Sequence, residues 1–590
     1  MTQAEPAHSA SQERWAPWDW AAAAFLFLAT VAVVVWQNSR LGVLWDLSYI
    51  LENSWRISLG DFPYRDFPFP YAPGTFLVQS WLIKLTGRAY FHHVLYCAIV
   101  GGLGTVLTWR ILALLLRARM PAFRLVAFLL AAPLTVLGIY CILPHPFYDP
   151  DCTFAILCCV FLLLCLERKA FPPVGGFLAG IVCVVPLFVK QNTGLAFLAA
   201  AAVSAAILAA HDAWRLRRAS GCVWLLAGMA AGLGAATMLI HFTVGLSNYW
   251  RWTIQFAAAR RLPSLSEMFA PYKNPLLLVW FAAFAAGAYL SRRSGGRGRI
   301  VSLLSVALMA APFAWPALYL LLDDDLAERA ERLLALWPVV LFISLLLAAR
   351  ELRRGLSLSR LLPFILIATV QGAFLSQQLW GSTYAIWPLL MILLAGILAE
   401  LFSLGGEASL RQIEWLAGIS VGCLCVAGGF YVASHERLNY ADLSTGDIAR
   451  STLPALAGLS VRGPWIPQFE ELVRFTDRAV PRDQGLLMIP GEDLFYYATG
   501  RHPRFPVVMF DHTINPYSRE EILALSRSRN ICWLVVKKNL QLDADPVENR
   551  AQLLELLRGD FAPVQSLANY DLYHRNGTSC GDSPFSAGPH

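Results

Sequence analysis

Long apolar runs recur along most of the chain and constrain its fold more than any other feature. They fall near residues 18–36, 91–116, 124–143, 152–166, 174–189, 195–210, 221–245, 275–290, 300–322, 333–349, 361–376, 385–403 and 413–433. A helix of about 20 apolar residues is long enough to cross a bilayer. The pattern therefore predicts an α-helical polytopic membrane protein with about thirteen transmembrane helices.

The balance of apolar and charged residues agrees with this prediction. Hydrophobic residues make up 57% of the 590 residues and charged residues only 15%, which excludes a soluble protein with an ordinary polar surface. The net charge of +7 does not indicate a nucleic-acid partner, because most basic residues stand in short clusters between apolar runs. We expect membrane lipids, and no nucleic acid, among its partners.

The basic clusters occupy alternate loops and predict the topology. They lie in residues 117–124, 168–169, 215–218, 292–299 and 350–360. By the positive-inside rule these loops are cytoplasmic. An odd number of crossings then predicts a cytoplasmic tail (1–17), a transmembrane domain (18–433) and an extracytoplasmic C-terminal domain (434–590) in the plasma (inner) membrane.

The C-terminal domain has the pattern of a small α/β unit. Helix-like segments (467–479, 519–528 and 546–557) alternate with short apolar runs (486–489, 505–510, 531–536 and 570–573). The chain has 12 cysteines without metal-ligand spacing. Cys532 and Cys580 are the pair in this polar part. A disulfide between them suits an oxidising compartment, but the strand-like surroundings of Cys532 favour a buried thiol.

The first predicted outer loop, residues 37–74, has two halves of different character. Its first half places apolar and polar side chains on opposite faces of a helix, which predicts a helix lying in the bilayer interface. These are Leu47, Ile50, Leu51 and Trp55 against Glu52, Asn53 and Arg56. The second half contains four prolines and cannot be helical. We call this stiff segment, residues 64–74, the strap.

Three carboxylates are predicted on the same outer surface. Asp46 follows the first span directly, and Asp149 and Asp151 follow a later one. A charged group at the membrane boundary is costly unless it is paired or used, so each is a functional candidate. For Asp149 and Asp151, ordinary Asp-Pro-Asp turn chemistry explains the residues equally well.

Two basic groups are also predicted on the outer side. Lys190 precedes Gln191 and Asn192 at a break between two spans, an arrangement that suits a phosphate; a snorkelling lysine at a helix end is the alternative. Arg260 and Arg261 stand in a long outer loop, where positive charge is not needed for orientation.

The order of these motifs resembles the GT-C superfamily of integral-membrane glycosyltransferases. The resemblance rests on Asp46, the PYRDFPFPYAPG strap, the Asp149/Asp151 pair and the KQNTG break. The nearest relatives by organisation are protein mannosyltransferases and lipid A aminoarabinose transferases. Protein mannosyltransferases generally carry a second acid where this chain has Leu47.

The resemblance implies roles for the candidate residues. Asp46 is implied either as the base that takes the acceptor's proton or as an acidic residue that positions the acceptor. Asp149 and Asp151 are implied as ligands of a divalent cation (Mg²⁺ or Mn²⁺) or of the donor. Lys190, Arg260 and Arg261 suit the donor phosphate. We expect Tyr64, Arg65, Asp66, Gln191 and Asn192 to line the substrate.

The implied reaction transfers a sugar from a polyprenyl-phosphate donor to an extracytoplasmic acceptor such as a glycolipid, polysaccharide or protein. A single displacement predicts inversion at the anomeric carbon. Two alternatives stay open. One is a polysaccharide polymerase or ligase that uses a diphosphate-linked donor, which paired arginines would favour. The other is a lipid or sugar transporter, which would carry more ionisable residues within its spans.

Overall fold

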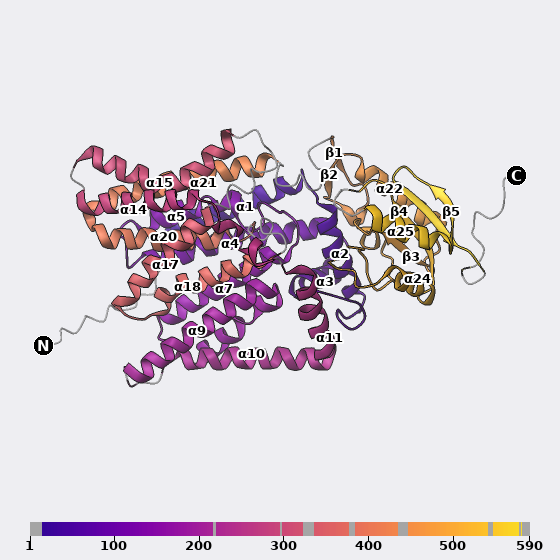
Figure 1. Cartoon of the computed structure of the whole chain (residues 1–590), viewed down its shortest axis with the longest axis horizontal. Helices are drawn as coiled ribbons and strands as arrows, with labels where there is room; N and C mark the ends of the chain where they lie inside the picture. Colours follow the sequence, from indigo (N-terminus) through magenta and orange to yellow (C-terminus); the bar gives the residue numbers. More distant parts are fainter. Residues whose placement is uncertain are drawn as a thin grey trace.

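In the computed structural model, a large helical bundle carries a small α/β domain at one end (Figure 1). The structure describes residues 15–215, 217, 220–262, 264–294, 298–322, 336–376, 384–434, 446–511, 513–540, 547–577 and 580. The predicted class, a polytopic helical protein with a small α/β domain at its C-terminal end, is confirmed.

Within these residues, nine helices are long and apolar enough to cross a membrane. They are α1 (Pro17–Asn38), α4 (Tyr90–Leu116), α7 (Tyr148–Glu167), α9 (Gln191–Arg215), α10 (Cys222–Thr243), α14 (Leu276–Ser294), α15 (Arg299–Leu322), α20 (Trp387–Gly405) and α21 (Leu410–Ser434). The chain is therefore an integral membrane protein.

The remaining predicted runs form shorter helices. These are α5 (Phe123–Ala131), α6 (Leu134–Leu137), α8 (Pro173–Val182), η1 (Val185–Phe188), α17 (Leu336–Glu351) and α18 (Leu358–Phe374). Each predicted apolar run thus overlaps a helix in the described residues, whereas the count of thirteen crossings stays a prediction.

The loops form two groups at opposite ends of the bundle. At one end Arg119 forms an ion pair with Glu351 at 2.5 Å, and the Ser359 N–H donates to Glu167 at 3.1 Å. These contacts join three of the loops that were predicted to share one side. At the other end lie α2 (Leu44–Ser58), α3 (Gly74–Thr86) and α11 (Leu246–Trp250), beside the α/β domain (Figure 1).

The predicted long outer loop after α10 is largely helical. It contains α11, the π-helix η2 (Arg251–Phe256), α12 (Ala257–Arg261), α13 (Leu265–Met268) and the short η3 (Ala270–Tyr272). Its exposed side chains include Trp250 and Ile254. Apolar side chains that stay exposed beside membrane spans suit a lipid boundary better than water.

The α/β domain is built on a four-stranded sheet of order β3-β4-β6-β5. Its strands are β3 (Gly485–Ile489), β4 (Ile531–Lys537), β5 (Phe561–Ser566) and β6 (Tyr570–Arg575). β3 and β4 are parallel, and the other pairs are antiparallel. The helices are α22 (Trp465–Ala479), α23 (Phe495–Thr499), α24 (Arg519–Ser528) and α25 (Val547–Arg558), and a small hairpin joins β1 (Ile448–Arg450) to β2 (Ser460–Arg462).

Both faces of the parallel pair are buried, which explains its continuous apolar sequence. Leu486 and Met488 point into the core that continues into the membrane domain, whereas Leu487 and Ile489 point into a second core of the α/β domain. The sheet is therefore packed between the bundle end and its own helices.

One of the four apolar runs of this domain forms no strand, and one strand was not predicted. Residues 505–510 form no strand, because Pro506 has no N–H to donate and the carbonyls of Phe505 and Pro506 accept hydrogen bonds from Arg56. Conversely, β5 was missed because it contains Pro563, which a strand at the sheet edge tolerates.

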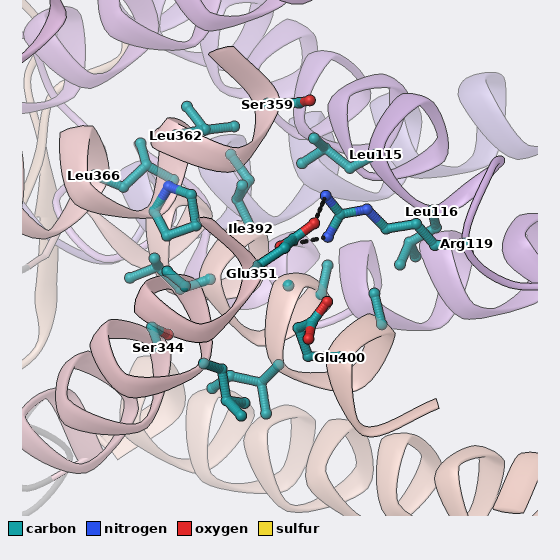
Figure 2. A pocket seen from close by; sticks show the side chains of 18 residues that line it. Leu115, Leu116, Arg119, Ser344, Glu351, Ser359, Leu362, Leu366, Ile392 and Glu400 are labelled. Carbon is teal, nitrogen blue, oxygen red and sulfur yellow. Dashed lines mark hydrogen bonds and ion pairs between the residues drawn. The ribbon is translucent and has the colours of Figure 1, made fainter. Parts of the chain in front are cut away.

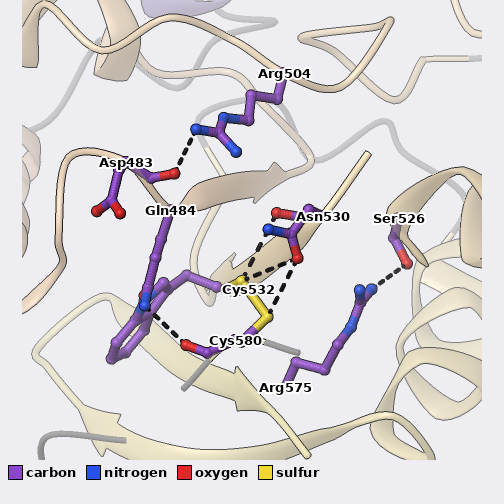
Figure 3. Close-up of a disulfide and its surroundings, with 9 residues drawn as sticks. Asp483, Gln484, Arg504, Ser526, Asn530, Cys532, Arg575 and Cys580 are labelled. Atoms are coloured by element: carbon purple, nitrogen blue, oxygen red, sulfur yellow. Dashed lines mark hydrogen bonds between the residues drawn. A yellow bond between two sulfur atoms is a disulfide. The ribbon is translucent and has the colours of Figure 1, made fainter. Parts of the chain in front are cut away.

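Cys532 and Cys580 form a disulfide, so the predicted buried thiol at Cys532 was wrong (Figure 3). Their Cα atoms lie 5.6 Å apart, within the usual range for a disulfide. The Gln484 side-chain amide also donates to the carbonyl of Cys580 at 2.9 Å. Cys580, which follows β6 in sequence, is thereby fastened to the start of β4.

Candidate functional site

The strap is a buried, irregular segment that other parts of the site contact. The Tyr64 hydroxyl donates to the Tyr71 carbonyl at 2.6 Å, which closes the strap on itself. Tyr64 has a φ of 70°, an unusual conformation for a residue with a side chain. Phe67 and Phe69 are buried and pack edge to face. Except at Arg65 and Asp66, most of the strap is therefore buried in the protein.

Asp46 lies in the first turn of α2 and is half-buried. Ring contacts join this helix to the strap and then to α7. The Tyr49 ring centroid lies 4.4 Å from that of Tyr71, and Tyr71 lies 5.4 Å from Tyr148. Since Tyr148 directly precedes Asp149, the strap connects the helix of Asp46 with the start of α7.

Lys190 and Asp149 form a buried ion pair at this end of the bundle. Both side chains are only 8% exposed. The ammonium of Lys190 also lies 5.9 Å from the centre of the Tyr148 ring. A buried ion pair is costly to maintain, so its presence beside the strap favours a functional explanation over a snorkelling lysine.

Asp151 is held by hydroxyl groups from three elements. One carboxylate oxygen accepts from Tyr96 at 2.8 Å and Tyr140 at 2.6 Å, and the other accepts from Thr75 at 2.7 Å. Thr75 directly follows the strap. Asp151 therefore fixes the strap to α4 and α7.

These carboxylates do not fit a divalent cation as they are arranged. Asp149 is paired with Lys190, and both oxygens of Asp151 already accept hydrogen bonds. Among the described residues, no group of three or more His, Cys, Asp or Glu side chains is placed to hold a metal. The expected Mg²⁺ or Mn²⁺ stays a prediction.

The break before α9 is fixed by close backbone approach. A Cβ on Gly194 would lie 2.2 Å from the Pro186 carbonyl oxygen, so only glycine fits there. The Gln191 amide donates to the Pro70 carbonyl of the strap at 3.3 Å, and Asn192 donates to Leu375 at 2.6 Å. Gln191 thus belongs with the strap, whereas Asn192 fastens α9 to the end of α18.

The remaining candidates lie in an exposed part of the strap and in the loop after α10. Arg65 and Asp66 form an exposed ion pair at 2.9 Å, and Asp66 also accepts from the Phe62 N–H. Arg260 donates to the Asn515 carbonyl of the α/β domain at 2.8 Å. Arg261 ends α12, and its side chain lies outside what the structure describes.

The α/β domain forms hydrogen bonds with α2, and this contact was not predicted. The Ser48 hydroxyl is within hydrogen-bond distance of the Gly491 carbonyl (2.8 Å) and the Asp493 carbonyl (3.0 Å). Glu52 accepts from the Tyr497 N–H at 3.1 Å. Ser48 and Glu52 lie on α2 just after Asp46. Their contacts with the α/β domain therefore fix the position of the helix that carries Asp46.

The polar face of α2 is therefore covered by protein. Glu52, Asn53 and Arg56 are all buried, and Leu47, Ile50 and Leu51 of the apolar face are buried as well, so the prediction of a helix lying in the bilayer interface was wrong. The three polar residues share one face of the helix. A polar face of this kind is equally consistent with contact to another part of the protein and with exposure to solvent. The sequence offered no means of choosing between them.

Burial changes the acidity of the carboxyls on and after α2. Desolvation raises the pKa of Glu52 well above its usual value, against hydrogen bonds from the Tyr497 and Tyr496 N–H groups. For Asp61 burial acts in the same direction, but hydrogen bonds from His502 and Arg56 hold the pKa below its usual value. Glu52 thus resists ionisation, whereas Asp61 stays a carboxylate.

A second buried charge cluster lies at the carboxyl ends of β3 and β4. Lys537 pairs with Glu492 at 2.7 Å and Asp493 at 2.8 Å, and the Tyr570 hydroxyl donates to Asp493 at 2.9 Å. The carboxyl edge of a parallel pair is a common ligand site in α/β folds. Here Ser48 of α2 docks beside it, so this edge serves as the contact with the membrane domain.

Comparison with known proteins gives similarity only at the level of solved structures. No protein-family model and no curated protein sequence matches the chain. ArnT from Cupriavidus metallidurans bound to undecaprenyl phosphate is similar over 96% of this chain and 99% of that chain, with 13% identity and a TM-score of 0.42.

A second similar structure is the Archaeoglobus fulgidus oligosaccharyltransferase tethered to an acceptor peptide. It covers 88% of this chain and 69% of that chain, with 11% identity and a TM-score of 0.44.

Proposed function

We propose that this chain is a membrane glycosyltransferase that moves one sugar from a polyprenyl-phosphate donor to an acceptor on the side of the α/β domain. The observation that carries the proposal is the buried Lys190–Asp149 pair, joined through the strap to the helix of Asp46. The reaction needs a cation for the leaving phosphate and a carboxylate for the acceptor, and the strap connects the elements that carry these two groups.

The cation suits the leaving group. When the bond between the anomeric carbon and the phosphate oxygen breaks, negative charge develops on the departing polyprenyl phosphate. A positioned ammonium stabilises that charge, and it does so more strongly in a site from which water is excluded. Lys190 meets this need, while Asp149 and the Tyr148 ring hold its ammonium in place.

The carboxylate suits the acceptor. The acceptor hydroxyl oxygen forms the new bond to the anomeric carbon as the phosphate departs, and its proton passes to Asp46. One displacement of this kind inverts the anomeric carbon. Apolar and aromatic surface around the loop after α10 suits the lipid tail of a donor that arrives within the bilayer.

The Asp46→Asn variant tests this assignment. Removing a general base costs about 10²–10⁴-fold in rate, whereas an amide of the same shape preserves packing. Transfer is measured with purified protein and a radiolabelled polyprenyl-phosphate sugar, and folding by the thermal unfolding midpoint. Asp483→Asn, an exposed acid of the α/β domain, is the matched control.

The donor is identified by mass spectrometry of lipid that copurifies with the wild-type protein. We expect a polyprenyl phosphate or its glycosylated form, whose head group identifies the sugar. Full transfer activity in folded Asp46→Asn would remove Asp46 from the chemistry. A diphosphate-linked oligosaccharide in the purified protein would instead indicate a polymerase or ligase.

A further inference from the structure

Three buried charged side chains meet at one loop of the α/β domain. The loop follows β3 and comprises residues 490–493, and we call it the β3 loop. The ammonium of Lys537 lies 2.7 Å from Glu492 and 2.8 Å from Asp493 of this loop. The Tyr570 hydroxyl donates to the other carboxylate oxygen of Asp493 at 2.9 Å. The last residue of β4 and the first residue of β6 thus hold the side chains of the loop.

This cluster is sealed from solvent. Lys537, Glu492 and Asp493 are each no more than 2% exposed. At the opposite end of the bundle, by contrast, the Arg119 partner of Glu351 is 24% exposed (Figure 2). A fully buried charge cluster contributes little net stability, because desolvation offsets the attraction between its charges. What such a cluster provides is a fixed geometry.

The backbone of the β3 loop is fixed from another side. Gly491 has a φ of 91°, and a Cβ there would lie 1.9 Å from the Val508 carbonyl oxygen, so only glycine fits. The Pro490 carbonyl accepts from the Phe510 N–H at 2.8 Å. The loop is thus held through its side chains by β4 and β6, and through its backbone by residues 508–510.

Two carbonyl groups of this loop contact α2. The hydroxyl of Ser48 lies 2.8 Å from the Gly491 carbonyl oxygen and 3.0 Å from that of Asp493, and Ser48 is fully buried. Ser48 stands two residues after Asp46. Because an α-helix has 3.6 residues per turn, both residues belong to one turn. The β3 loop therefore holds the turn of α2 that carries Asp46.

We propose that Ser48 is a positioning residue for sugar transfer, through which the β3 loop sets where the Asp46 carboxylate meets the acceptor. The inference rests on the proposed function, in which Asp46 accepts the proton of the acceptor hydroxyl. That step requires a base within hydrogen-bond reach of the hydroxyl. A displacement of about 1 Å can lower the rate about 100-fold even when its cause is remote from the reacting atoms. The α/β domain thereby contributes to catalysis through the position of α2.

Ser48→Ala removes this contact, and Ser54→Ala is its matched control. Ser54 is also a fully buried serine of α2, but its hydroxyl donates to the Ile50 carbonyl of the same helix at 2.7 Å. The two variants lose the same atom from the same helix, and Ser48→Ala alone removes a hydrogen bond to the β3 loop. Transfer is measured on the purified full-length chain, with a radiolabelled polyprenyl-phosphate sugar as donor and heat-treated cell envelopes as acceptor.

In Ser48→Ala the kcat for transfer should fall about 10- to 100-fold. KM for the donor should stay unchanged, because the donor phosphate is assigned to Lys190 and not to Asp46. Ser54→Ala should keep the wild-type values of both constants. Thermal unfolding of both variants verifies that each is folded at the assay temperature.

The Asp46→Asn background distinguishes positioning from a merely structural role. If Ser48 acts through the Asp46 carboxylate, Ser48→Ala should lower the residual transfer of Asp46→Asn no further, because the group that it positions is already gone. A structural role would lower transfer by the same factor in both backgrounds. Equal factors would therefore overturn the inference.

Tyr570→Phe tests the same connection from the side of the α/β domain. It removes one hydrogen bond to Asp493 and keeps the ring. We expect a smaller fall in kcat than in Ser48→Ala, and again no further fall in the Asp46→Asn background. This variant decides the matter if Ser48→Ala does not fold, because a wild-type kcat in Tyr570→Phe would then overturn the inference.

Two other results would overturn the inference and leave the proposed function intact. They are a wild-type kcat in folded Ser48→Ala and an equal loss of kcat in Ser54→Ala. The proposed function fails instead if the wild type transfers no sugar or if Asp46→Asn is fully active, and the inference then fails with it. The two kinds of failure are therefore distinguishable.

Discussion

The two ends of the helical bundle place charge differently. At the end that carries the α/β domain, Lys190 and Asp149 are both almost fully buried, and Asp151 is enclosed by three hydroxyl groups. At the opposite end, Glu351 is buried but its partners Arg119 and Arg360 remain partly exposed. The first arrangement excludes water from both charges, and the second leaves the cations in contact with their surroundings.

This difference in burial affects how firmly the charged groups are held at each end of the bundle. A buried pair costs several kcal/mol of desolvation per ion, so its geometry must be held by the surrounding protein. Such a pair is preorganised, which suits the stabilisation of a departing phosphate. Partly exposed arginines can exchange partners at low cost.

The largest expected effect concerns the buried pair. Lys190→Gln removes the ammonium and leaves the Asp149 carboxylate buried, so the free energy of unfolding should fall by about 3–5 kcal/mol. The measurement is thermal unfolding of the purified protein in detergent. Transfer activity should be lost as well, because Lys190 is assigned to the leaving phosphate.

The Lys190→Gln/Asp149→Asn double variant separates these two losses. It removes both charges, so stability should return towards the wild-type value while transfer stays absent. If the double variant transferred sugar at the normal rate, the pair would be purely structural. If Lys190→Gln alone left stability unchanged, the two ends would not differ in the way described.

Sequence patterns predicted the parts of the structure that depend on neighbouring residues. The apolar runs predicted the membrane helices, and α24 begins and ends where it was predicted. Its start is marked by Ser518 and Glu521, which form a capping box. The break before α9 was likewise visible in the KQNTG motif.

Contacts between distant segments could not be predicted in the same way. Ser48 and Gly491 are 443 residues apart, and their hydrogen bond depends on how the α/β domain docks on the bundle. Lys190 and Asp149 were each identified as candidates, but with different expected ligands. Their pairing follows from the packing of α7 and α9, which sequence periodicity does not determine.

A moderate effect is expected for Glu52, which is buried between α2 and the α/β domain. Because its pKa is raised in the folded protein, ionisation opposes folding. Wild-type stability should therefore be greatest below the unfolded pKa, about 4.3, and should decrease as the pH rises towards the folded value. Glu52→Gln keeps an oxygen for the Tyr497 N–H and cannot ionise.

Glu52→Gln should therefore raise the unfolding midpoint at pH 8 more than at pH 5. The measurement compares both proteins by thermal unfolding at several pH values. Asp61→Asn is the control with the opposite sign, because the pKa of Asp61 is lowered by His502 and Arg56. Its stabilising contribution is present above the unfolded pKa, so removing it should cost stability at pH 8 and little at low pH. Equal shifts for Glu52→Gln at all pH values would contradict the assignment.

The smallest effect is expected at the opposite end. Arg360→Gln removes one of two guanidinium groups beside Glu351, and Arg119 still holds that carboxylate through two hydrogen-bonded nitrogens. Partly exposed ion pairs contribute less than about 1 kcal/mol, so the free energy of unfolding in lipid-free detergent should change by no more than that. A loss of unfolding free energy as large as that of Lys190→Gln would mean that the arginines are held as firmly as Lys190. The two ends of the bundle would then not differ in how they hold their charged groups.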